Sequence, residues 1–148
     1  MFTKIGLLTL SLAACSAMAM TNLPNGSFSG QGHWKDNTGA SGDYSTAAVV
    51  ANNGVSSTYT FNGQSKSFTM ATPLDQNGFF PVTVAGTNVG SGYCWSVQCH
   101  YTISQDGGTL EETLTFYQTH LYRTGSKTVN GKTIIWEEAL DRSSQLKK

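Results

Sequence analysis

Apolar and polar residues alternate in short runs along most of the chain, and turns that contain glycine separate these runs. An alternation with a period of two predicts a strand with one buried face, and no helical period extends over a useful length. The pattern therefore predicts an all-β domain with strands at residues 27–35, 43–51, 55–61, 65–71, 79–85, 93–104, 109–117, 120–129 and 132–140.

Two turns fix the registers of their hairpins, because Asn-Gly tolerates the positive φ angles of a two-residue type I′ turn. The Asn62-Gly63 turn places Phe61 opposite Gln64, and the inward face of this hairpin is expected to carry Val55, Tyr59, Phe61, Phe68 and Met70. The Asn130-Gly131 turn is expected to pair Leu121 with Leu140, Arg123 with Glu138 and Gly125 with Trp136.

A less regular turn at residues 105–108 joins two more strands with apolar faces. Either register that suits this turn places the following residues on one face: Val97, Cys99, Tyr101, Ile103, Leu110, Glu112, Leu114 and Phe116. Residues 117–120 contain no Gly, Pro or Asn, so the flanking runs could also form one long strand that bends through a bulge.

Sequential hairpins of this kind form an antiparallel meander, which must pack as a sandwich or close on itself to remove its open edges. Closure is favoured because the connections are short, whereas a Greek-key sandwich needs longer crossings. We expect a single barrel of roughly eight strands.

The first residues predict an export signal, with Lys4 ahead of a short apolar stretch. Residues 17–19 (Ala-Met-Ala) form a signal-peptidase site, which gives a signal peptide at 1–19, a linker at 20–26, the barrel at 27–141 and a polar tail at 142–148. The alternative is a lipoprotein signal, because residues 12–15 resemble a lipobox that would lipidate Cys15. We expect a periplasmic or secreted protein, or an outer-membrane lipoprotein in the second case.

Charge and cysteine content restrict the kinds of partner and cofactor that the sequence predicts. The chain has 9 basic and 9 acidic residues, so it lacks the positive balance that binding to nucleic acid requires. Cys94 and Cys99 remain in the exported domain and predict a disulfide. With His100 they also form C-x4-C-H, a variant of the c-type haem attachment motif, but alternation places Cys99 and His100 on opposite faces.

Gly32-His33-Trp34 on the first predicted strand resembles the G-x-W motif with which lipocalins and the wider calycin group begin. In those families a late-strand arginine packs over the tryptophan and closes one end of the barrel, and Arg123 matches that arginine. The resemblance implies a calycin-like barrel in which Trp34, Arg123 and Glu138 are structural. The other end would hold a small, often apolar molecule. Residues 34–41 also look avidin-like, but no biotin-site pattern follows.

Several polar or aromatic groups are predicted to face the interior, where an unpaired polar group is costly. One interpretation is that Tyr101, Glu112 and Trp136 line a ligand cavity. The other is that the polar groups satisfy one another, with Glu138 bound to Arg123 and Glu112 bound to Tyr101.

Catalytic and metal-binding signals are weak. His33, His100 and His120 have no metal-ligand spacing, and the sequence suggests no cofactor. Adjacent glutamates on a strand point to opposite faces, so an acid–base pair would have to combine Glu112 with Glu138. No G-x-S-x-G elbow is present, and residues 86–92 lack the lysine of a phosphate-binding loop.

The sequence thus predicts a non-catalytic binding protein that holds a small or lipid-like molecule in a barrel. The alternative is an envelope or secreted factor, such as an inhibitor, that binds another protein and has a filled barrel. The presence of a cavity distinguishes the two.

Overall fold

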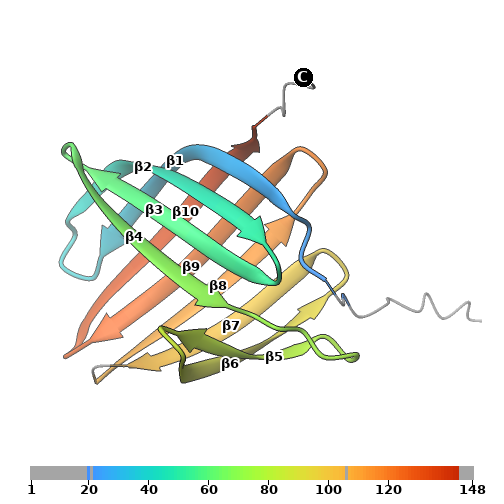
Figure 1. Cartoon of the computed structure of the whole chain (residues 1–148). Helices are drawn as coiled ribbons and strands as arrows, with labels where there is room; N and C mark the ends of the chain where they lie inside the picture. The colour runs from blue at the N-terminus through green and yellow to red at the C-terminus, as the bar shows by residue number, and fades with distance from the viewer. Residues whose placement is uncertain (1–19, 21, 106, 144–148) are drawn as a thin grey trace, which may run out of the picture.

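The computed structural model describes residues 20, 22–105 and 107–143. They form an antiparallel barrel of ten strands rather than about eight (Figure 1): β1 (Gly26–Asp36), β2 (Ser41–Ala51), β3 (Gly54–Phe61), β4 (Gln64–Ala71), β5 (Phe79–Val84), β6 (Thr87–Trp95), β7 (Gln98–Gln105), β8 (Gly108–Phe116), β9 (His120–Val129) and β10 (Lys132–Arg142). The all-β class and the meander are confirmed.

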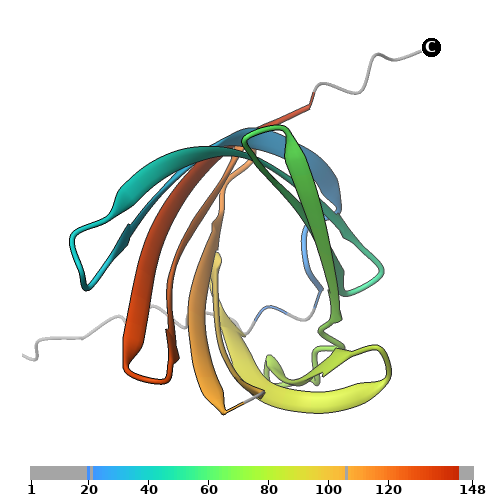
Figure 2. The ribbon, with the colours of Figure 1, turned by 90° about the vertical axis from the view of Figure 1, so that its left-hand side faces the viewer.

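The sheet closes because β1 pairs with β2 on one side and with β10 on the other. Figure 2 shows the strands arranged around a central axis. The join between β4 and β5 is the shortest in the ring, with the single residue pair Ala71–Thr83. Closure satisfies the backbone groups that an open sheet would expose at its edges.

The strand count differs from the sequence prediction because residues 93–104 are not one strand. Trp95 ends β6 and Gln98 begins β7, with Ser96 in the left-handed region at φ 56°. Neither Ser96 nor Val97 is a usual type I′ turn residue, so the turn carries no sequence signal. Cys94 and Cys99 pair directly across it and form the predicted disulfide. Residues 87–92, which were considered only as a phosphate-binding loop, belong to β6.

The registers set by the turns are confirmed. Phe61 lies opposite Gln64, and Asn62 has φ 48°. In the β9–β10 hairpin Arg123 lies opposite Glu138, and Gly125 lies opposite Trp136. The β7–β8 pairs also agree, except that Val97 lies in the turn and is exposed. Residues 117–119 separate β8 from β9, so no single long strand forms here.

The interior has two halves. One half is a packed apolar core made by residues such as Phe28, Val50, Met70, Leu114 and Leu140. Leu23, within the segment expected to be a linker, is buried in this core. The other half lies toward the end where the strand pairs β1–β2, β3–β4, β5–β6, β7–β8 and β9–β10 make their turns, and it is not filled.

Candidate functional site

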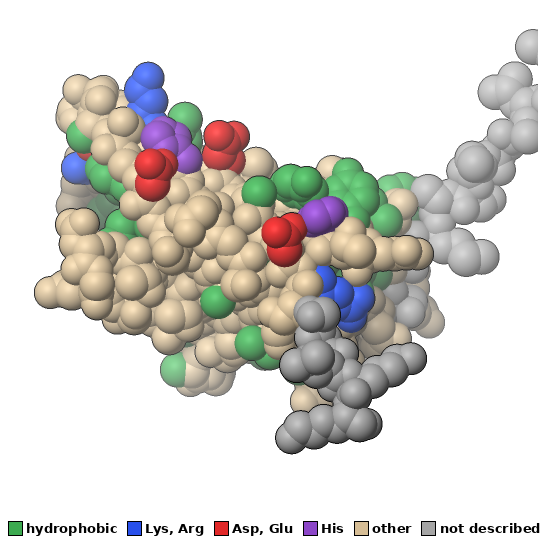
Figure 3. Space-filling view, turned by 90° about the horizontal axis from the view of Figure 1, so that it is seen from above, with side chains coloured by type: hydrophobic (Ala, Val, Ile, Leu, Met, Phe, Trp, Pro, Cys, Tyr) green, Lys and Arg blue, Asp and Glu red, His purple; other side chains and the backbone are tan. Residues whose placement is uncertain are grey.

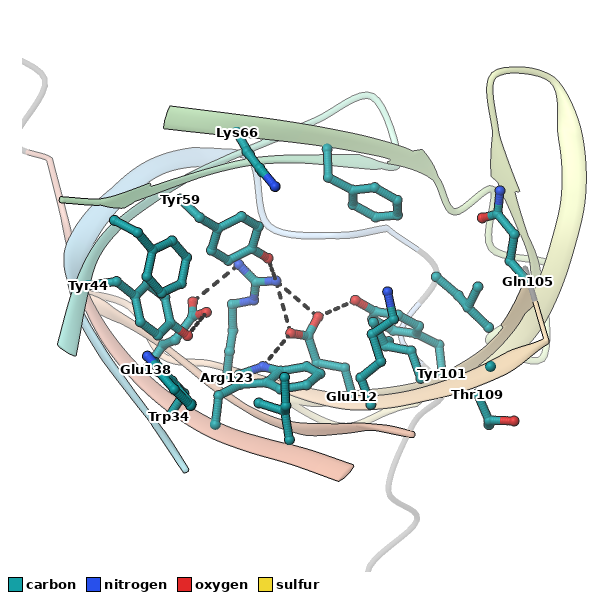
Figure 4. Close-up of a pocket in the computed structure, with 18 of the residues that line it drawn as sticks. Trp34, Tyr44, Tyr59, Lys66, Tyr101, Gln105, Thr109, Glu112, Arg123 and Glu138 are labelled. Atoms are coloured by element: carbon teal, nitrogen blue, oxygen red, sulfur yellow. Dashed lines mark hydrogen bonds and ion pairs between the residues drawn. The ribbon is translucent and has the colours of Figure 1, made fainter. Parts of the chain in front are cut away.

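A cavity of about 640 Å³ occupies this second half of the barrel. Its walls are mainly aromatic and aliphatic, and polar groups lie at the floor and at the rim. Figure 4 shows side chains from strands around the barrel converging on it. The wall is formed by Trp34, Tyr44, Tyr59, Phe61, Phe68, Ile103, Leu110, Ile134 and Trp136.

Glycines on the inward faces of the strands give the aromatic rings their room. An added Cβ at Gly32 would overlap the Tyr44 ring, which lies across the strand. At Gly125 it would overlap the Trp136 ring, and at Gly42 it would lie 3.0 Å from Trp34 Nε1. Each glycine faces its aromatic partner in the register of the sheet. The glycine of the G-x-W motif is therefore explained by Tyr44, which crosses it.

The floor of the cavity is a network of ion pairs centred on Arg123, which is 2% exposed. Its Nη2 donates to Glu112 Oε1 at 2.9 Å and to Oε2 at 3.1 Å, and its Nη1 lies 3.2 Å from Glu138 Oε2. Nη1 also donates to Ser57 Oγ at 3.0 Å, and Nη2 donates to the Tyr59 hydroxyl at 2.6 Å. One cation thus holds two buried carboxylates, which repays part of the large cost of burying them.

Neutral donors complete the network. Tyr44 donates to Glu138 Oε1 at 2.7 Å, Tyr101 donates to Glu112 Oε2, and Trp136 Nε1 donates to Glu112 Oε1 at 3.1 Å. Burial, followed by the nearby carboxylate, raises the pKa of Tyr44 and of Tyr101, so both hydroxyls keep their protons and remain donors. The carboxylates are therefore held in place from several sides.

Burial also acts on the charged members of the network. It raises the pKa of the Glu138 carboxyl, and the attraction of Arg123 offsets this only in part. Burial on its own would lower the pKa of Arg123, but Glu112 and the other acidic neighbours outweigh it, and the pKa rises well above its usual value. Arg123 is a permanent cation beneath the cavity.

The expected stacking of Arg123 on Trp34 is wrong. Within the described residues the aromatic ring under the Arg123 guanidinium belongs to Tyr59, with 5.5 Å between the guanidinium carbon and the ring centroid. Trp34 lies on the cavity wall, against Gly42. The two residues belong to the pocketed half of the barrel, whereas the resemblance placed them at a closed structural end. Tyr59 takes the position under the guanidinium because β3 faces β9 across the interior.

The structure places Tyr101, Glu112 and Trp136 together on the cavity surface. The pairings considered as an alternative are also present, since Glu138 binds Arg123 and Glu112 binds Tyr101. The two interpretations therefore do not exclude each other: the polar groups pair with one another at the bottom of an unfilled space, and of Arg123 only Nε is left without a partner. The two glutamates share one guanidinium, so neither is a free acid or base.

Sequence reasoning missed part of the site. Tyr44, Thr46 and Ser57 complete the network, and Lys66, Lys127 and Lys132 line the mouth of the cavity. Alternation on β2 and β3 could have shown that Tyr44, Thr46 and Ser57 face inward. It could not have shown that they meet residues of β9 and β10 across the barrel.

The C-x4-C-H motif is not a haem attachment site in this state, because the disulfide uses both sulfur atoms that thioether bonds would need. His100 faces outward and hydrogen-bonds Thr113. Cys15 lies outside the described residues.

The histidines are dispersed over the outer surface. His33 lies 2.7 Å from Asp43, and His120 lies 2.7 Å from Asp141, in exposed pairs. Figure 3 shows purple histidine side chains touching red acidic ones on a face that is mostly neither apolar nor charged. Across the described ranges, no group of three or more His, Cys, Asp or Glu side chains is placed to hold a metal ion. No helix in the same part of the chain has the length and apolar content needed to cross a membrane.

No protein-family model matches the chain, and no curated protein is significantly similar to it in sequence. The closed antiparallel barrel is compatible with a calycin-like fold.

Proposed function

We propose that the protein is a non-catalytic binding protein that holds a small or lipid-like molecule in the open half of its barrel. The single observation that carries this proposal is the cavity of about 640 Å³ above a hydrogen-bonded ionic floor. Ligand pockets commonly have about 300–1,000 Å³ and are mainly apolar with a few placed polar groups. A barrel that serves only as a scaffold for external loops has no need of such a space.

The polar floor supports this interpretation, because its charged groups are already paired without a ligand, and among the described atoms of the floor Arg123 Nε is the buried one that has no hydrogen-bond partner. Arg123, Glu112 and Glu138 bind one another and their neighbours, so an incoming molecule does not have to break them apart. Most of the surface that remains for contact is apolar, from aromatic residues such as Trp34 and Tyr59 and from the aliphatic residues of the wall. Such a wall binds a ligand by burying apolar surface area, and it tolerates ligands that differ in their detailed structure.

Binding is testable with N-phenyl-1-naphthylamine, an uncharged aromatic probe whose emission rises in apolar surroundings. Ile134 lines the cavity, whereas its neighbour Ile135 points outward and is 53% exposed. We expect the wild type and the control Ile135→Trp to bind the probe with similar affinity, and Ile134→Trp, which fills the cavity, to bind at least tenfold more weakly. Equal binding by both variants, or no binding by the wild type, would contradict the proposal.

We also propose that the protein acts outside the cytoplasm, as a periplasmic, secreted or lipid-anchored protein. The Cys94–Cys99 disulfide supports this, because such bonds persist in oxidising compartments. Intact mass spectrometry of the protein from its own cells tests it. A mature N-terminus at residue 20, or an acylated one at Cys15, is expected, and an intact chain from Met1 in the cytoplasmic fraction would refute it.

A further inference from the structure

The cavity carries opposite charge at its two levels. At the floor, two carboxylates, Glu112 and Glu138, face the single guanidinium of Arg123. At the mouth, three lysines line the same cavity, Lys66 from β4, Lys127 from β9 and Lys132 from β10. The positive end of the site is therefore the end that opens to solvent.

These lysines stand on the inward faces of their strands. Lys66 lies opposite Tyr59, and Lys127 lies opposite Ile134, both of which are wall residues. All three lysines are exposed, so their ammonium groups reach water while their alkyl stems border the cavity. Figure 4 shows the Lys66 amine directed over the pocket.

The positive charge at the mouth is only partly neutralised. Lys132 Nζ lies 3.1 Å from Asp36 Oδ2, and a hydrogen bond from Thr38 is the main cause that lowers the Asp36 pKa to about 2. Among the described carboxylates, none lies within ion-pair distance of Lys66 or Lys127. Asp106 lies outside the described residues. Three lysines against Asp36 leave an excess of positive charge around the mouth.

The floor of the cavity, in contrast to the mouth, disfavours an anion. With Glu112 and Glu138 ionised, the network around Arg123 has an excess of negative charge, and Tyr44, Tyr101 and Trp136 already donate to those carboxylates. Glu112 and Glu138 already pair with the terminal nitrogens of the guanidinium, and Arg123 Nε is the one nitrogen left without a partner, so an anionic group placed there would be repelled by two carboxylates in a poorly solvated space. An anion is therefore better placed at the mouth than at the floor.

We infer that the ligand is an amphipathic anion, bound with its apolar part inside and its anionic head group at the mouth among Lys66, Lys127 and Lys132. This inference rests on the proposed binding function and adds the class and the orientation of the ligand. The aromatic wall buries the tail, and the lysines attract a carboxylate or phosphate head. The ligand enters tail first, and Arg123 makes no contact with the head.

The inference is tested by displacement of N-phenyl-1-naphthylamine from the purified protein with its disulfide formed. Decanoate, decyl phosphate, decanol and decylammonium have alkyl tails of nearly equal length and differ in the charge of the head group. We expect the two anions to compete about tenfold better than decanol, and decylammonium to compete more weakly than decanol. Exposed ion pairs contribute about two- to fivefold each in affinity, and added salt should reduce the advantage of the anions.

Variants locate the head group. In the triple variant Lys66→Gln, Lys127→Gln, Lys132→Gln, the affinity for decanoate should fall to that for decanol, while decanol is unaffected. The control Lys35→Gln removes an exposed lysine that does not line the cavity, and it should change neither.

The outcomes separate the two proposals. Probe binding with no preference for anions, or a preference that survives in the triple variant, would overturn the ligand class or its orientation and leave the binding function standing. Failure of the wild type to bind the probe would overturn both.

Discussion

Replacement of Arg123 by methionine tests whether the guanidinium stabilises the barrel by neutralising two buried carboxylates. Glu112 and Glu138 are 2% and 3% exposed, and both lie within 3.2 Å of Arg123 nitrogen atoms. Removal of one partner from a buried ion pair commonly costs about 3–5 kcal/mol, because a charge is left buried without compensation. We expect Arg123→Met to reduce the free energy of unfolding by about that amount near pH 7.

The loss of stability in Arg123→Met should depend on pH, and the sign of this dependence follows from the pKa of the buried carboxyl that loses its partner. Burial raises the pKa of the Glu138 carboxyl and Arg123 offsets this in part, so without Arg123 the folded-state pKa of Glu138 rises further above the unfolded value of about 4.3. A carboxyl with a raised folded-state pKa favours folding at low pH, and that contribution is lost as the pH rises through the folded-state pKa. The deficit of the variant should therefore shrink when the pH is lowered from about 7 to about 4.5.

Urea unfolding followed by far-UV circular dichroism at the two pH values measures the effect. The triple variant Arg123→Met, Glu112→Gln, Glu138→Gln is the control, because it removes all three charges. It should recover most of the lost stability, and its remaining deficit should not depend on pH. A loss under about 1 kcal/mol, or the same loss at both pH values, would refute the role given to Arg123.

Three further predictions concern separate parts of the barrel. Gly125→Ala should destabilise the protein by about 1–3 kcal/mol, since its methyl group overlaps the Trp136 ring; a denaturation midpoint equal to that of the wild type would contradict this. The double variant Cys94→Ser, Cys99→Ser should lose about 2 kcal/mol, the value expected for a short closed loop, while keeping the far-UV spectrum of a barrel; unchanged stability would show that the disulfide adds nothing. Because the folded-state pKa of Glu138 is raised, the stability of the wild type relative to Glu138→Gln should fall as the pH rises from about 4.5 to about 8. Urea unfolding measures this difference in stability. If the difference rises over that pH range, the pairing of Glu138 with Arg123 outweighs the effect of its burial.

Much of the fold could be predicted from alternation and from two Asn-Gly turns. These turns fix Phe61 opposite Gln64 and Arg123 opposite Glu138, because a type I′ turn determines its own register. The turn at Ser96 could not be predicted in the same way. Its left-handed residue is a serine, and the cross-strand disulfide reinforces a turn that its residue types do not favour.

The site could be predicted only within a hairpin. The inward positions of Tyr101 and Glu112 follow from local register, and so does the pairing of Arg123 with Glu138. The contact of Arg123 with Tyr59 joins strands on opposite sides of the barrel, where no turn relates one residue to the other. The geometry of this contact depends on closure of the barrel. The motif on the first strand therefore predicted the wrong aromatic partner for Arg123.

The pairing of β1 with β10 has a consequence for how the chain reaches its native state. Every other junction joins neighbours in sequence, whereas this one brings Phe28 next to Arg142. Contacts of such large sequence separation form late and slowly, because most of the chain must become ordered before these contacts can stabilise it. Until the last strand docks, the first strand presents unsatisfied amides that another copy could pair with. The time spent in that half-closed form, more than the stability of the finished protein, should set how readily it aggregates during refolding.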